Sequence, residues 1–182
     1  MYAARLARCL SPRTGGPAGH ARTQIDHAPP PLYDDRLRAS EGEQGARDHA
    51  IVVTLLGTGL RRAELIGLRI ADLDLGERRL RIRGSTSKSV HPREITLPPE
   101  VVKVLDRYVH DYRRGDNEDE APLFTDRRGN QLTGQAVRRL FDRLKTRTGI
   151  RDLCAHMLRH TWATNYNRSK SGSTFDLQVE GG

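Results

Sequence analysis

The chain has 182 residues, about the size of one ordinary domain, and 36% of them are hydrophobic, so we expect one core with some segments outside it. Lys and Arg number 31 against 23 Asp and Glu, and the net charge of +8 suits a polyanionic partner but also fits a basic surface that serves only solubility. Cys9 and Cys154 form no disulfide framework or paired metal motif, which favours a reducing cytoplasm, and no apolar run approaches the roughly 20 residues of a membrane-crossing helix.

The first 45 residues are expected to form a disordered basic leader and linker. Residues 1–25 contain no acidic residue, carry several arginines and are interrupted by glycine and proline, and the prolines at 29–31 favour an extended segment. Residues 46–182 would then form a single folded domain. Its tail after residue 166 is rich in Ser and Gly, so we expect this tail to be poorly ordered.

The first half of the folded part predicts two helices and two strands. The apolar run IVVTLL predicts a buried helix over 46–57, and a short helix is expected over about 61–68. Apolar residues alternate with arginine over 78–84 and recur at every second position over 93–98, the period of half-buried strands. Together these two segments predict a small antiparallel β-ribbon.

The second half predicts three more helices. One is expected over about 98–112, because proline is tolerated in a first turn and the apolar residues that follow have helical spacing. Thr133 suits the N-cap of a second helix that a glycine stops at position 149. A last helix is expected over 156–166. The predicted fold class is therefore α+β and mostly helical.

Two short stretches place charged side chains on helix faces. In TGLRRAEL, Arg61 stands at a helix start and Glu64 follows one turn later, where its carboxylate can orient the guanidinium or can form an ordinary solvated salt bridge. In HMLRHTWAT, His156, Arg159 and His160 share one helical face, which a packed core would not select.

A zinc site is an alternative for the second stretch. The two histidines are four residues apart, as in many zinc pairs, and Cys154 lies nearby. However, Arg159 between the ligands would repel a dication, and no Glu follows His156. We therefore favour a site without a metal.

The two stretches in this order resemble the signature boxes of tyrosine recombinases of the phage integrase family. The strands between them resemble the small β-ribbon of that family, whose turn carries a catalytic lysine. Lys88 stands where this lysine is expected, after a loop longer than usual, so a plain charge at a hairpin tip remains an alternative. The resemblance covers roughly residues 46 to 180.

The resemblance implies a site-specific recombinase or integrase that acts on double-stranded DNA, with other recombinase protomers as further partners and without a cofactor or metal. Arg61 and Arg159 would clamp the non-bridging oxygens of the scissile phosphate, and Lys88 would protonate the departing 5′ oxygen. His156 would act on the proton of the attacking hydroxyl or bond a phosphate oxygen. Glu64 would support Arg61, and His160 is expected to bond within the fold.

The resemblance also implies a third sequence box followed by a nucleophilic tyrosine, which forms a phosphotyrosine intermediate. The last tyrosine here is Tyr166, seven residues after Arg159. We therefore expect a catalytic domain that is incomplete at its C-terminus and inactive alone. Two alternatives stay open: a DNA-binding module that occupies recombination sites, and a nonfunctional remnant. Trp162 is expected in the core and not as a platform for DNA bases.

Overall fold

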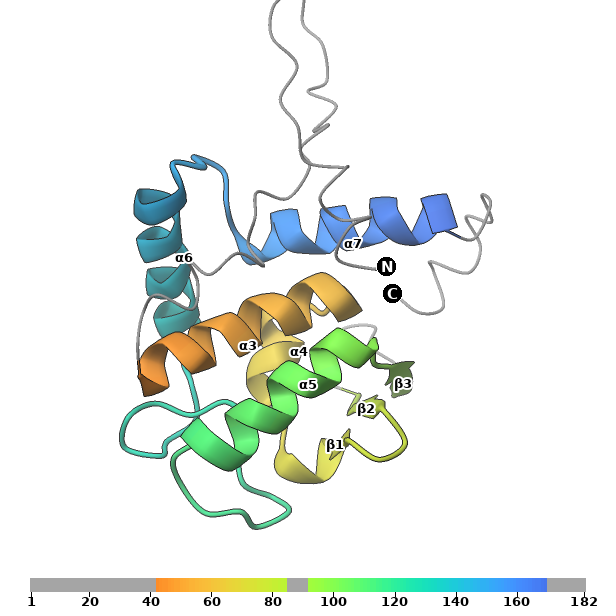
Figure 1. Cartoon of the computed structure of the whole chain (residues 1–182), viewed down its shortest axis with the longest axis vertical. Helices are drawn as coiled ribbons and strands as arrows, with labels where there is room; N and C mark the ends of the chain where they lie inside the picture. Colours follow the sequence, from red (N-terminus) through yellow and green to blue (C-terminus); the bar gives the residue numbers. More distant parts are fainter. Residues whose placement is uncertain (1–41, 85–91, 170–182) are drawn as a thin grey trace, which may run out of the picture.

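A computed structural model describes residues 42–84 and 92–169 of the chain (Figure 1). The helices are α3 (Glu43–Thr58), α4 (Arg62–Gly67), α5 (Pro99–Arg107), α6 (Gly134–Thr148) and α7 (Ala155–Ser169), with a 3-10 turn η1 (Ile70–Asp72) and a π-helical turn η2 (Tyr108–Tyr112). The strands are β1 (Leu73–Asp74), β2 (Arg79–Ile82) and β3 (Arg93–Thr96). This is the mostly helical α+β fold that the sequence predicts.

Helix α3 lies at the centre of the fold. It packs against α7 and α5, which lie on opposite sides of it (Figure 1). The whole run Ala50–Leu56 is buried, because a helix that is apolar on all faces is stable only when other elements surround it. The predicted buried helix is confirmed, and it begins at Glu43, three residues before its predicted start.

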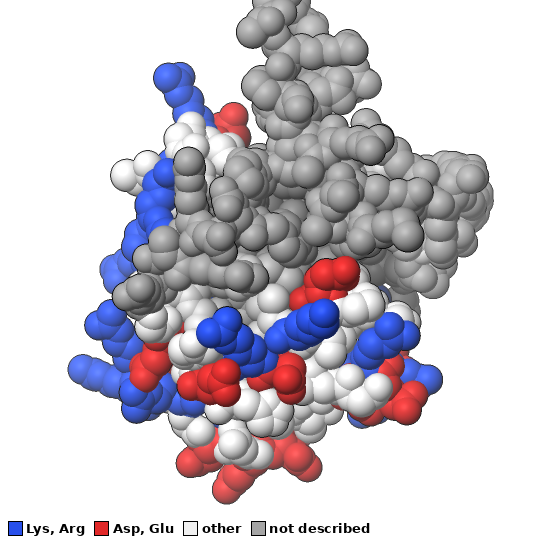
Figure 2. All heavy atoms as spheres, in the orientation of Figure 1, with Lys and Arg blue, Asp and Glu red and all other residues white. Residues whose placement is uncertain are grey.

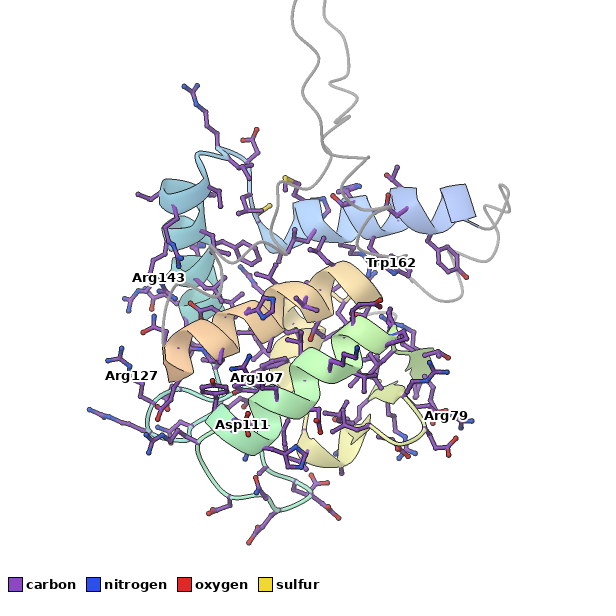
Figure 3. The ribbon with its side chains drawn as sticks, viewed as in Figure 1. Arg79, Arg107, Asp111, Arg127, Arg143 and Trp162 are labelled. Carbon is purple, nitrogen blue, oxygen red and sulfur yellow. The ribbon has the colours of Figure 1, made fainter. Side chains whose placement is uncertain are left out.

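The C-terminal end of α3 contacts α7 directly. Gly59 ends the helix in the left-handed conformation, with φ 64°, and its N–H donates to the Leu55 carbonyl at 3.0 Å. Trp162 of α7 is buried against this glycine, on the side of α7 that faces α3 (Figure 3). The prediction that Trp162 belongs to the protein interior is therefore confirmed.

The sheet is antiparallel, in the order β1-β2-β3. Leu80 and Ile82 of β2 are buried, and they lie opposite Ile95 and Arg93 of β3 in the register. The predicted ribbon is thus β2 and β3, and their connection at 85–91 lies outside the described residues. The two-residue strand β1 was not predicted, because two residues are too few to show the alternation of apolar and polar positions that indicates a strand.

The remaining helices follow the predicted signals. Pro99 is the first residue of α5, and the chain continues through η2 to Tyr112. The Thr133 hydroxyl accepts the Ala136 N–H at 3.1 Å, and Gly149 ends α6 in the left-handed conformation. The π-helical geometry of η2 was not predicted, since the apolar spacing there fits an α-helix equally well.

No helix in the described part of the chain is long and apolar enough to cross a membrane. The predicted leader at 1–45 lies almost entirely outside the described residues, and so does most of the predicted loose tail.

Candidate functional site

A pocket of about 670 Å³ opens at one end of α7, beside α4 and α6. Its walls come from the turn between α3 and α4, from α4, from α6 and from the start of α7 with the residue before it: Leu60, Arg61, Arg62, Arg138, Phe141, Asp142, Lys145, Cys154, Ala155, His156 and Arg159. Three of the predicted site residues, Arg61, His156 and Arg159, therefore line one cavity although the first lies far from the other two in sequence. Concave sites with converging polar groups are where proteins bind small or reacting groups.

Arg61 reaches the pocket from the start of α4. It is the N-cap of that helix, and its backbone N–H donates to the Glu64 carboxylate at 2.8 Å. This contact fixes the backbone from which the Arg61 side chain projects. The side chain itself is 45% exposed, and its Nη1 lies 3.6 Å from Glu64 Oε1, at the long end of ion-pair distances.

The Glu64 carboxylate has a closer partner, Arg93 at the start of β3. The two nitrogens Nη1 and Nη2 of Arg93 donate to Oε1 and Oε2 of Glu64 at 3.1 and 3.0 Å. Both side chains are nearly buried, with 6% of Glu64 and 11% of Arg93 exposed. The side chain of Glu64 thus holds Arg93 more tightly than Arg61.

Sequence reasoning missed Arg93, although a signal was present. Strand side chains alternate between two faces, so Arg93 and Ile95 share one face of β3, and Leu97 continues this spacing just after the strand. An arginine on the apolar face of a strand needs a carboxylate partner, because a buried charge without one is costly. Glu64, the acidic residue of the TGLRRAEL stretch, was a candidate for this carboxylate partner.

Arg159 lies deeper than Arg61. It is half-buried and donates through Nη1 to the carbonyl of Gly59, at the end of α3. Burial lowers the pKa of its guanidinium, the charge of Arg61 lowers it further, Glu64 raises it and Arg93 lowers it. An arginine remains protonated in proteins despite such effects. Three cations and one carboxylate therefore lie within electrostatic reach of each other, and the cluster carries an excess of positive charge.

His156 and His160 form a pair on the exposed side of α7. Their Nε2 atoms lie 2.8 Å apart, so one ring donates a hydrogen bond to the other, and the rings meet edge to face. His156 also lines the pocket. The expectation that His160 bonds within the fold agrees with this contact. In the described ranges 42–84 and 92–169, no group of three or more His, Cys, Asp or Glu residues is arranged to hold a metal ion.

The far wall of the pocket is also basic. Arg62 comes from α4, and Arg138 and Lys145 come from α6, where Lys145 lies 3.6 Å from Asp142. Figure 2 shows lysine and arginine side chains along the edge of the molecule at which Figure 1 places α6. These three residues were not singled out from the sequence. Lys88, which was, lies outside the described residues.

Residues 34–176 match the phage integrase family. Similar curated proteins include the tyrosine recombinases XerC of Corynebacterium glutamicum, 36% identical over 133 residues, and of Pelobacter propionicus, 35% identical over 126 residues. These alignments cover 73% and 69% of this chain but 42% and 40% of the relatives. The chain thus spans less than half the length of these two relatives.

Solved structures give the same fold. A crystal structure of XerA recombinase superposes with a TM-score of 0.63 at 29% identity, covering 82% of this chain and 56% of that one. The recombinase XerH bound to its difH substrate superposes with a TM-score of 0.64 at 23% identity, covering 81% of this chain and 43% of that one.

Proposed function

The chain belongs to the phage integrase family, and from this premise we propose that its pocket binds and activates one phosphodiester of double-stranded DNA for strand exchange by a tyrosine recombinase. The observation that carries the proposal is that Arg61 and Arg159 line a single cavity. A phosphodiester under attack gathers negative charge on its two non-bridging oxygens, and a guanidinium can bond two such oxygens at once.

The other site residues take roles that match their positions. His156, on the pocket wall, bonds a phosphate oxygen or accepts the proton of the attacking hydroxyl. Its contact with the His160 Nε2 orients its ring. Lys88 supplies the proton for the leaving 5′ oxygen, a role that rests on its position in the sequence between β2 and β3.

The nucleophile is not among the described residues that line this pocket, since none of them carries a hydroxyl group. Tyr166 lies on α7, where its ring stacks on Trp162 with 5.3 Å between the ring centres. We therefore propose that the 182-residue chain binds DNA but does not cleave it unaided. The proposed alternative, a module that occupies recombination sites, shares the binding step and differs only in never completing the reaction.

Two arginine substitutions and a matched control test the binding step. At fixed salt, Arg61→Gln and Arg159→Gln should each weaken duplex DNA binding about tenfold, since a charged hydrogen bond is worth roughly 1.5 kcal/mol or more. Arg79→Gln removes the same charge from an exposed position on β2, paired with Glu94 (Figure 3). Its affinity should stay within about twofold of wild type. The readout is fluorescence anisotropy of a labelled duplex, with salt held constant because phosphate contacts depend on it. Equal losses in all three variants would contradict a specific pocket and leave only general charge attraction.

A further inference from the structure

We infer that Arg93 is a positioning residue for the phosphate site: by pairing with Glu64 it keeps the Arg61 guanidinium on the pocket wall and off the carboxylate. The inference rests on the proposed function, because it concerns the placement of one of the two arginines of the proposed clamp. It adds a residue of β3 that does not itself line the pocket.

First, removing the Glu64 carboxylate from water costs free energy unless other groups stabilise its charge. Glu64 is only 6% exposed, and an ionised carboxylate removed from water needs hydrogen-bond donors and a cation. The Arg61 N–H supplies one donor at 2.8 Å, and the paired nitrogens of Arg93 supply two more at 3.1 and 3.0 Å. Arg93 therefore donates one hydrogen bond to each carboxylate oxygen. This parallel two-point geometry is the strongest contact that a single guanidinium makes with a carboxylate.

The second step is the competition between two arginines for one carboxylate. Arg61 lies within ion-pair range of Glu64, at 3.6 Å, and 45% of its side chain is exposed. If Arg93 lost its charge, the buried carboxylate would attract the Arg61 guanidinium into the place that Arg93 now fills. A guanidinium in that place spends two of its five N–H groups on the carboxylate and leaves the pocket wall, which Arg61 lines and Arg93 does not. The proposed clamp would then lose the contribution of Arg61 although Arg61 itself is unchanged.

The third step is the rigidity of Arg93. It is the first residue of β3 and lies opposite Ile82, a buried residue of β2. The sheet therefore fixes the backbone from which Arg93 reaches Glu64. Such an anchor favours the present assignment of partners, with Arg93 on Glu64 and Arg61 on the pocket wall.

The experiment is a set of variants of the full chain, measured by anisotropy on a labelled 30-base-pair duplex at fixed salt. Arg93→Gln should weaken binding about tenfold, and it should add no more than about twofold in an Arg61→Gln background, because both changes remove the same contact. Glu64→Gln combined with Arg93→Gln should return affinity to within about threefold of wild type, because no buried charge is left to attract Arg61. The matched control is Arg79→Gln with Glu94→Gln, a neutralised pair on β2 and β3 that should change affinity less than about twofold.

Arg93→Lys keeps the positive charge but cannot make the two-point contact with Glu64. It also provides a test if Arg93→Gln does not fold. It should keep affinity within about threefold of wild type, because the lysine ammonium still attracts the Glu64 carboxylate and so keeps it from drawing Arg61 away. A loss about tenfold or greater in Arg93→Lys, with an unchanged unfolding midpoint, would overturn the inference because the charge would then not be the cause. The inference would also be overturned if the double variant lost as much DNA affinity as the fold-losses of Arg93→Gln and Arg61→Gln multiplied together. Independent losses of this kind would mean that Arg93 contacts DNA itself.

A second measurement does not involve DNA. In a crystal structure of Arg93→Gln, or of Arg93→Lys should the first variant fail to fold, the Arg61–Glu64 separation reports the competition directly. With Gln it should fall from 3.6 Å to about 2.9 Å, and with Lys it should stay near its present value. The inference is contradicted if the Arg61–Glu64 separation stays near 3.6 Å in Arg93→Gln. It is also contradicted if that separation falls to hydrogen-bond distance in Arg93→Lys. If instead Arg61→Gln leaves DNA affinity unchanged, the proposed function fails, whatever the distances show.

Discussion

Gly59 satisfies two requirements at one position. Its φ of 64° lies in the left-handed region, where a side chain costs energy, and a Cβ there would lie 2.2 Å from Cε3 of Trp162. Its carbonyl also accepts the hydrogen bond from Arg159. The turn that ends α3 therefore serves both the packing of α7 and the placement of Arg159, one arginine of the proposed clamp.

Gly59→Ala should destabilise the chain by about 2–4 kcal/mol, the sum of backbone strain and of overpacking against a ring. Gly149→Ala is the matched control, because Gly149 has a similar φ of 73° with no atom within 4 Å of an added Cβ. It should cost only about 1–2 kcal/mol. Urea unfolding of both variants measures the difference. Equal losses in the two variants would show that Trp162 moves aside at no cost.

Among the helices and strands, those whose position depends on their own residues were predicted correctly from the sequence. The apolar run of α3, the proline at the start of α5 and the Thr133 and Gly149 ends of α6 each carry their own signal, and all are present. The position of Arg93 among alternating apolar residues signals that it needs a carboxylate partner, but it does not identify Glu64, which lies on a helix that meets the strand only in the fold. The basic wall from α6 was missed for the same reason.

The cap of α6 can be tested alone. Thr133→Ala removes the acceptor of the Ala136 N–H, and loss of an N-cap costs about 1 kcal/mol. Thr146→Ala, on the same helix, removes only an exposed hydroxyl that bonds the Asp142 carbonyl one turn earlier. It should be neutral or slightly stabilising, because alanine has the higher helix propensity. Thermal unfolding separates the two, and a Thr133→Ala protein as stable as Thr146→Ala would mean that the cap contributes nothing.

On the scale of the whole molecule, charge is distributed unevenly. Basic side chains follow the edge formed by α6, and acidic ones gather at the opposite lower end, where the loop after η2 lies (Figure 2). That loop contains four exposed acids, at positions 116, 118, 119 and 120. A duplex would be attracted to the pocket side and repelled from the acidic end, so charge alone favours the orientation that brings DNA to Arg61 and Arg159.

Among the residues that the structure describes, no tyrosine lines the pocket, and we predict binding without cleavage. A duplex nicked beside the scissile phosphate traps any covalent adduct as a band that survives denaturant. We expect no such band from the 182-residue chain, because an arginine clamp has little to stabilise without an oxygen in line with the bond. A band that disappears on Tyr166→Phe would identify Tyr166 as the nucleophile and refute this expectation.

A structure of the chain bound to duplex DNA would show directly whether one phosphodiester lies between Arg61 and Arg159. The proposed function predicts one phosphate whose non-bridging oxygens lie about 2.8 Å from nitrogens of both guanidiniums, the distance of charge-assisted hydrogen bonds. His156 should face the same phosphate from the pocket wall. DNA bound with both guanidiniums turned away from every phosphate, or with the two arginines on different phosphates, would contradict it.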